Sequence, residues 1–243
     1  MTQPLYALLM ILIMMLANFT NPVMAKEKPP QNFVYLDDPR IVVVLAYAGQ
    51  DNFIGRPIAG YEGNRVLTTL KAARALRAVQ DALDGYDKGY HLKIFDAYRP
   101  QQAIQDFKQW VADPVDQKNK AQYYPDLSKE DLCKLGYIAG SYSTHSRGST
   151  FDLTIVVRDA SGNEQALDMG TSFDFFDSAS HTHATGISEQ ARKNRLFLLS
   201  VMEKHGFEHY EKEWWHFTLI DEPYPRRYFD FVIRDDYSLD EIS

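Results

Sequence analysis

The amino-acid sequence predicts a single α+β domain with a central, mostly antiparallel sheet flanked by helices. Short apolar runs rich in β-branched and aromatic residues are mixed irregularly with amphipathic stretches of helical period. This order lacks the regular strand–helix alternation that is typical of a parallel α/β fold. The chain has 243 residues, 45% of them hydrophobic and 24% charged, so it is long enough to bury one sizeable core.

The first half of the chain predicts two strands separated by a long helix. Residues 41–46, IVVVLA, predict a buried strand because β-branched side chains favour extended backbone. Residues 66–83 place apolar side chains at three-to-four spacing, which predicts an amphipathic helix that ends at Gly85. Residues 91–98, HLKIFDAY, predict the second strand, which Pro100 ends because proline has no backbone N–H for a sheet.

Three further helices are expected downstream. Residues 103–112 continue as a helix after the proline. Another helix is expected to begin at Ser128, where Asp131 is placed to complete a capping box. The last long helix is expected over residues 188–206, which ends at a glycine.

Two more strands and one long loop complete the expected elements. Residues 152–157, DLTIVV, and residues 214–220, WWHFTLI, are short apolar runs of the type that predicts strands. Residues 169–186 have no clean period and carry several Asp and His side chains. We therefore expect a loop there that covers a functional site.

Charge and composition restrict the classes of partner. The net charge is -7 and no cluster of lysine and arginine stands out, which argues against a nucleic-acid groove or an anionic membrane surface. Small molecules are therefore the expected partners, and the sequence does not indicate an oligomeric state. Cys133 is the only cysteine, so an internal disulfide is excluded.

The first 25 residues differ in character from the rest of the chain. A continuous apolar run is followed by NPVMA, in which Val23 and Ala25 satisfy the small-residue rule for signal cleavage. We expect residues 1–25 to be a secretory signal and residues 26–243 to be the domain, located in the periplasm without stable membrane association. The alternative is an uncleaved membrane anchor, although the run is short for a span.

Two segments carry residues of the types that bind zinc. His145 precedes Asp152 at the start of one strand, with Gly148 between them to allow a tight loop. His216 lies on the last strand, three residues after Glu213. Because side chains alternate along a strand, that spacing requires either that Glu213 precede the strand or that a bulge re-aim it. Spacing alone leaves open a metal site and a set of ordinary polar residues.

The ordered motifs of the whole chain resemble a known family. SxHxxGxxxD at 143–152, followed by ExWH at 213–216, resembles the signature of the zinc-dependent D-Ala-D-Ala peptidases, which include D,D-carboxypeptidases and the Hedgehog-type zinc domain. Within that group the sequence is most similar to the D-Ala-D-Ala dipeptidases of the vancomycin-resistance type. The segments that carry the resemblance, in order, are DNFIGRPIAGYE (51–62), DAYRP (96–100), YYP (123–125), STHSRGSTFDLT (143–154), MGTSFDFFD (169–177), EWWHF (213–217) and DEPYPRRYFDF (221–231).

The resemblance implies a fold, a metal and a reaction. It implies a Hedgehog/D-Ala-D-Ala peptidase-like fold that binds one Zn²⁺ per chain through His145, Asp152 and His216. It also implies hydrolysis of the free dipeptide D-Ala-D-Ala in cell-wall metabolism, with Glu213 as the catalytic base and Arg99 at the scissile carbonyl. The alternative for Arg99 is a plain salt bridge to its neighbour Asp96.

Further residues are implied at the amino end of the substrate, namely Tyr47, Ser143 and Asp174. Asp174 could instead be an ordinary loop acid. His181 and His183 form an HxH pair that could compete for a metal, but the resemblance leaves both outside the ligand set and favours loop histidines near a substrate pocket.

Two other functions stay open at this point. One is a D,D-carboxypeptidase that trims peptidoglycan stem peptides, and the other is a zinc-binding module without catalysis. Glu213 and Arg99 argue against the second, since a binding module needs neither residue.

Overall fold

The computed structural model describes residues 28–159 and 161–238, so the expected signal segment lies outside the described residues. A central sheet has the strand order β2-β4-β5-β8-β7, and β6 pairs with β5. The β2–β4 pair is parallel and the other pairs are antiparallel, which confirms the predicted sheet type. The strands are β2 (Val42–Val43), β4 (Tyr90–Asp96), β5 (Thr150–Arg158), β6 (Glu164–Ala166), β7 (Phe207–Tyr210) and β8 (Glu213–Leu219).

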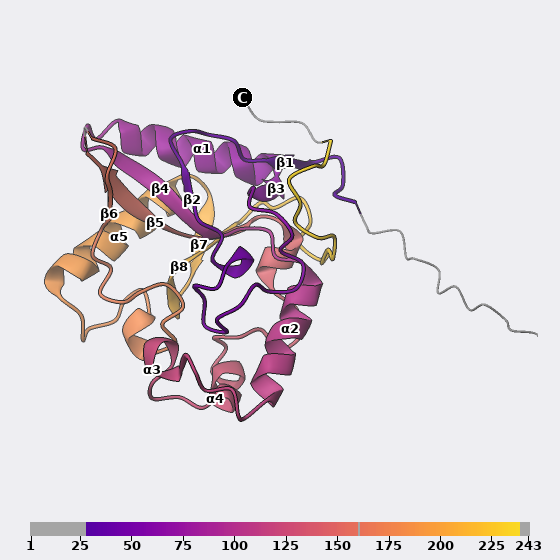
Figure 1. The fold of residues 1–243 in the computed structure, drawn as a ribbon. Helices are drawn as coiled ribbons and strands as arrows, with labels where there is room; N and C mark the ends of the chain where they lie inside the picture. The colour runs from indigo at the N-terminus through magenta and orange to yellow at the C-terminus, as the bar shows by residue number, and fades with distance from the viewer. Residues whose placement is uncertain (1–27, 160, 239–243) are drawn as a thin grey trace, which may run out of the picture.

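Helices lie in two groups around this sheet. Figure 1 shows α1 and α5 beside the sheet, whereas α2, α3 and α4 lie together below it. A separate two-stranded sheet pairs β1 (Phe33–Tyr35) with β3 (Leu67–Thr69). The helices are α1 (Leu70–Asp84), α2 (Gln101–Ala112), α3 (Lys120–Tyr123), α4 (Lys129–Lys134) and α5 (Glu189–Lys204), with short 3-10 turns η1 (Ala46–Ala48), η2 (Thr144–Arg147) and η3 (Ser178–Ser180).

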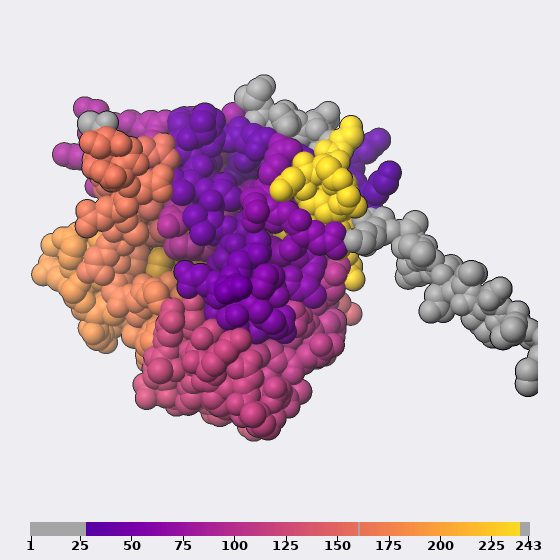
Figure 2. All heavy atoms as spheres, in the orientation of Figure 1, coloured from indigo at the N-terminus to yellow at the C-terminus, as the bar shows by residue number. Residues whose placement is uncertain are grey.

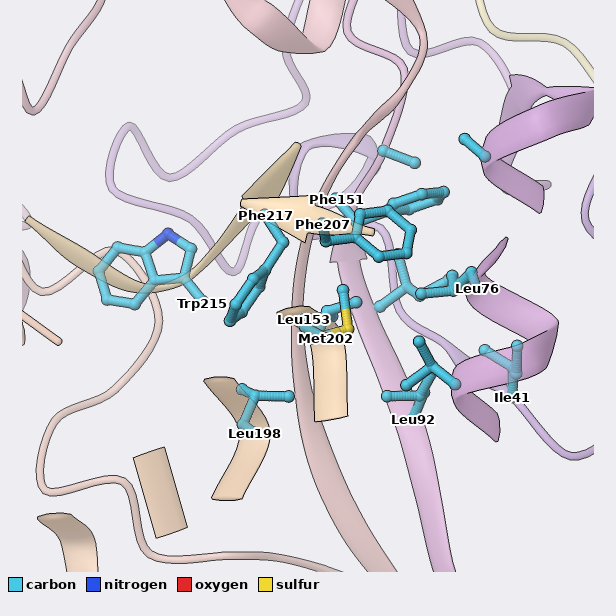
Figure 3. Close-up of a cluster of buried hydrophobic side chains, with 14 of the residues drawn as sticks. Ile41, Leu76, Leu92, Phe151, Leu153, Leu198, Met202, Phe207, Trp215 and Phe217 are labelled. Carbon is cyan, nitrogen blue, oxygen red and sulfur yellow. The ribbon is translucent and has the colours of Figure 1, made fainter. Parts of the chain in front are cut away.

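Apolar side chains from α1, α5 and the sheet form one core. Figure 3 shows Leu76 of α1 and Leu198 and Met202 of α5 directed toward sheet residues such as Leu92 and Leu153. All five side chains are fully buried. Burying an aliphatic side chain of this size contributes about 1.5–3 kcal/mol, so this core holds the sheet in place.

A second core is mainly aromatic and lies toward α2. Phe33, Phe53, Phe107, Trp110 and Phe231 are among its buried members. Many of its rings meet edge to face, the arrangement that aromatic quadrupoles favour. In the view of Figure 2, the first described residues of the chain, drawn in indigo, lie at the middle of the visible surface, and the magenta segment that includes α2 to α4 lies below them.

Several predicted boundaries are confirmed by their caps. The Ser128 side chain accepts a hydrogen bond from the backbone N–H of Asp131, and the Asp131 carboxylate accepts one from the backbone N–H of Ser128, so the predicted capping box is present. Ser188 caps α5 by accepting from the backbone N–H of Ala191. The expected long loop over residues 169–186 is also confirmed, with η3 as its one short helical turn in the described chain.

The predicted strand 41–46 is largely wrong. Only Val42–Val43 pairs, as the edge strand β2, and the chain then turns into η1. Val43 and Val44 are 36% and 49% exposed. An apolar β-branched run at a sheet edge has a partner on one side only, so the composition alone suggested more strand and more burial than the fold provides.

The predicted helix at 66–83 begins later than expected. Residues Leu67–Thr69 form β3, paired with β1, and the helix begins at Leu70. The Thr69 side chain accepts from the backbone N–H of Ala72 and so caps α1. Pairing with a distant strand overrode the helical period at these first residues.

In the described part of the chain, no helix has both the length and the apolarity needed to cross a membrane.

Candidate metal centre and peptidase site

The three predicted zinc ligands, His145, Asp152 and His216, meet at the central strands of the sheet. Two of them lie on the sheet itself: Asp152 of β5 is opposite His216 of β8, and on its other side it is opposite Asp96 of β4. His145 lies on η2, which Gly148 joins to β5 with φ of 83°. A Cβ at Gly148 would lie 2.3 Å from the Phe33 ring, so glycine is required there by space as well as by backbone.

The ligand atoms have the separations that a tetrahedral metal site needs. His145 Nε2 lies 3.2 Å from Asp152 Oδ2, His216 Nδ1 lies 3.1 Å from Asp152 Oδ1, and the two imidazole nitrogens are 3.3 Å apart. Donor atoms each about 2.0–2.2 Å from a tetrahedral zinc would lie roughly 3.3–3.6 Å from one another. The donor set therefore closes on one point.

Hydrogen bonds behind the ligands orient their lone pairs. His145 Nδ1–H donates to the Ala97 carbonyl at 2.7 Å, and His216 Nε2 contacts Thr144 Oγ1 at 3.1 Å. These bonds turn the other ring nitrogen of each imidazole toward Asp152. Within the described residues, the buried Asp152 Oδ1 accepts no hydrogen bond. A buried carboxylate oxygen and two imidazole lone pairs facing one another fit a cation between them.

The protonation states of His216 and Asp152 also suit a metal site. Burial lowers the pKa of His216, which favours the neutral imidazole that binds metals. Burial alone would raise the pKa of Asp152, but His145 and His216 hold it below its usual range. The carboxylate therefore stays ionised, as a ligand must.

Glu213 lies beside the ligand set. The β7–β8 register shifts here, because Tyr210 pairs with Glu213 whereas His209 pairs with Phe217. Of the two explanations that the sequence left open, the bulge is therefore right, and it brings Glu213 Oε2 to 3.5 Å from His216 Nδ1. Burial raises the pKa of Glu213 well above its ordinary value, and the charges of Asp152 and Asp174 add to that. A cation at the ligand set would lower it again.

Arg99 both forms the salt bridge and lines the site. Its Nε–H donates to Asp96 Oδ2 at 2.8 Å and its Nη2–H donates to Asp152 Oδ2 at 3.1 Å. The guanidinium also lies 4.9 Å from the centre of the Tyr47 ring. Asp96 thus fixes the direction of a buried cation that borders the cavity.

The residues implied for the substrate's amino end lie on the same cavity. Tyr47 OH donates to Asp174 Oδ2 at 2.9 Å, and Asp174 is only 3% exposed. Burial raises the pKa of Asp174 well above its ordinary value, the Asp152 charge raises it further, and Arg99 opposes the shift. Ser143 Oγ accepts from the His145 backbone N–H at 3.3 Å. A cationic ligand would therefore find a buried carboxyl group at this end.

The cavity that joins these groups is small, with a volume of about 180 Å³. Pockets for drug-sized ligands are roughly 300–1,000 Å³, so this one suits a much smaller molecule. Its walls include aromatic and apolar residues that sequence reasoning did not select, among them Tyr137, Ile138, Tyr142, Phe176 and Tyr210.

Comparison with known proteins agrees with this geometry. A family model described as D-ala-D-ala dipeptidase, of the M15 peptidases, matches residues 36–234. The chain belongs to this family of metallopeptidases. The D-alanyl-D-alanine dipeptidase of Enterococcus faecalis is 45% identical over 187 residues, which is 77% of this chain and 90% of that relative. The proteins of the same name from Streptomyces coelicolor and Escherichia coli are 40% and 36% identical, over 77% and 74% of this chain and 90% and 80% of their own lengths.

M15 peptidases are zinc-dependent in general, and the donor set of this family member fits that metal.

Thr144, which orients His216, lies within the motif that carries the resemblance but was not predicted as a site residue. Its position between Ser143 and His145 is the only local signal for it. Tyr137, Ile138, Tyr142 and Tyr210 come from segments without a chemical motif, so no sequence signal indicates them. Phe176, in contrast, lies within the MGTSFDFFD segment that carries part of the resemblance.

The HxH pair of the long loop is divided between two environments. His181 Nε2 lies 3.0 Å from the hydroxyl of Tyr137, a cavity-lining residue. His183 lies on the surface, with its Nε2 3.8 Å from Glu211 Oε2. The two histidines therefore do not form one metal site with each other.

Proposed function

We propose that this protein hydrolyses the free dipeptide D-Ala-D-Ala to two D-alanines, with one zinc ion per chain. The observation that carries the proposal is a single small cavity that joins the His145–Asp152–His216 donor set, Glu213 and the buried carboxyl group of Asp174. The family match and the relatives named D-alanyl-D-alanine dipeptidase support the same activity. The partner is a small dipeptide.

The metal has a defined place in this proposal. His145, Asp152 and His216 would hold the zinc, and the same three side chains line the cavity in which substrate would bind. A zinc ion bound by three such ligands polarises a carbonyl oxygen and lowers the pKa of water to about 7. The hydrogen bonds from His145 to Ala97 and between His216 and Thr144 keep both rings oriented for this purpose.

Glu213 is proposed to move the proton. Its carboxylate takes a proton from the attacking water molecule and delivers it to the leaving amine, a transfer that contributes typically 10²–10⁴-fold in rate. Its buried place beside His216 supports that assignment.

Arg99 is proposed to stabilise the negative charge that develops on the carbonyl oxygen. Asp96 orients the guanidinium, and the rings of Tyr47 and Phe107 pack against it, so little reorganisation is needed when the charge appears.

Asp174, Ser143 and Tyr47 are proposed to bind the ammonium group of the substrate. The ammonium group of a bound substrate would oppose the rise in pKa that burial causes at Asp174, so that Asp174 supplies the negative charge when substrate is present. Tyr47 orients this carboxylate through the 2.9 Å hydrogen bond, and Ser143 supplies a hydroxyl oxygen. A longer peptide would place an uncharged amide against a buried carboxylate. This supports a dipeptidase over a carboxypeptidase.

The test compares substrates of different length. Wild-type enzyme is incubated with D-Ala-D-Ala, N-acetyl-D-Ala-D-Ala and a stem pentapeptide, and released D-alanine is measured. We expect the free dipeptide to be cleaved at least about 30-fold faster in kcat/KM than either longer compound. Equal rates for the acetylated compound would assign the protein as a D,D-carboxypeptidase, and turnover of none of the three would leave a zinc-binding module.

The cellular location is a separate proposal. The apolar segment that ends at Ala25 supports export to the periplasm and a role in cell-wall metabolism. N-terminal sequencing of the protein from the native cell envelope should begin near Lys26. A membrane-bound chain that begins at Met1 would identify the segment as an anchor.

A further inference from the structure

A second group of metal-binding side chains lies outside the cavity. His183 of the long loop, His209 of β7 and Glu211 of the β7–β8 turn each offer one ligand atom, and these atoms all lie within 4.8 Å of one another. His209 Nε2 is 3.2 Å from Glu211 Oε2, and His183 Nε2 is 3.8 Å from the same oxygen. These separations are close to the roughly 3.3–3.6 Å between ligands of a tetrahedral zinc.

The surroundings of His209 orient it as a ligand. Its Nδ1 lies 3.5 Å from Glu203 Oε1, while its Nε2 faces Glu211. A carboxylate behind one ring nitrogen, with the other nitrogen directed at the metal, is the arrangement that supports histidine ligands in zinc sites. This contact is independent of the Glu211 carboxylate that would itself bind the ion.

Metal could reach these side chains from solution. The side chains of His183 and Glu211 are 55% and 52% exposed, whereas that of His209 is 22% exposed and thus anchored. Two imidazoles with one carboxylate favour borderline ions such as Zn²⁺ over Mg²⁺ or Ca²⁺, which prefer all-oxygen ligand sets.

We propose that His183, His209 and Glu211 form a second, solution-accessible site for Zn²⁺ that clamps the loop segment 178–186 to the β7–β8 turn. The backbone already joins the two, since the Thr182 N–H donates to the Glu211 carbonyl at 2.8 Å. The clamped elements border the active cavity, because the turn leads directly into β8, whose first residue is Glu213, and the loop carries His181, which contacts Tyr137. An ion that binds only the folded arrangement stabilises it.

The test is a zinc titration of dialysed full-length protein by calorimetry, with bound metal counted after gel filtration in the titrating buffer. Wild type should take up a second equivalent of Zn²⁺ beyond the tight one, and Mg²⁺ should not replace it. His183→Ala and Glu211→Gln should each lose the second equivalent. His181→Ala, the other histidine of the HxH pair, should retain it and serves as the matched control.

The His216→Ala variant separates this site from the catalytic one. It should lose the tight zinc equivalent and keep the weaker one. Binding of the weaker equivalent can therefore be measured even if the catalytic assignment of His216 is wrong. The melting temperature of wild type should rise on adding the second equivalent, and that of His183→Ala should not. The proposal is overturned if wild type stops at one equivalent, or if His183→Ala still binds the second.

Discussion

Asp174→Asn is the most informative single substitution at the proposed substrate-binding end. Asp174 has φ of 58°, a left-handed conformation that asparagine also tolerates, so the variant adds little backbone strain. The amide oxygen can still accept the 2.9 Å hydrogen bond from Tyr47 OH. The substitution therefore removes the negative charge and little else.

The magnitude follows from the burial of that charge. Asp174 is 3% exposed, so a substrate ammonium beside it is largely removed from water. Leaving a buried charge without its partner costs about 2–5 kcal/mol, which is roughly 30-fold to several thousand-fold in kcat/KM. We expect that loss for D-Ala-D-Ala and almost no change for N-acetyl-D-Ala-D-Ala, which has no ammonium group.

The assay measures kcat/KM for both compounds with metal content checked in each preparation. Asp177→Asn is the matched control, because Asp177 belongs to the same loop, does not line the cavity and uses a side-chain oxygen that asparagine retains to cap η3. Should Asp174→Asn reduce both substrates by the same factor, Asp174 would support the shape of the site and would not bind the ammonium.

Three further outcomes are expected. Glu213→Gln should keep its fold and zinc but lose at least about 10²-fold in kcat, because an amide cannot accept the proton; retained turnover would assign the base elsewhere. His216→Ala should lose nearly one tight zinc equivalent by metal analysis, and unchanged tight binding would remove His216 from the site. The hydrogen bonds from Arg40 lower the pKa of Asp38 to about 2, so this carboxylate adds about 2 kcal/mol to the free energy of unfolding at pH 7. This contribution is complete above about pH 4 and disappears as the pH falls through 2. The difference in free energy of unfolding between wild type and Asp38→Asn, measured in urea, should therefore shrink by about 1 kcal/mol between pH 7 and pH 3. A difference that stays constant would contradict the ion-pair explanation.

Local patterns in the sequence were sufficient for much of the fold. The period of α1 and α5, the capping box at Ser128 and the apolar runs of β4, β5 and β8 depend on neighbouring residues, so they can be recognised without the tertiary structure. The proposed ligand set came from ordered motifs that resemble a family, and the family match agrees with that resemblance.

Contacts between distant segments decided the rest. IVVVLA became an edge strand and a turn because only β4 was available beside it, and residues 67–69 became β3 because β1 paired with them. The bulge that brings Glu213 to His216 depends on the register of β7 against β8. His183 faces His209 and Glu211 instead of its neighbour His181, since the loop docks on that turn. Each outcome depends on which backbone groups and side chains meet across long sequence separations, and local spacing carries no information about such meetings.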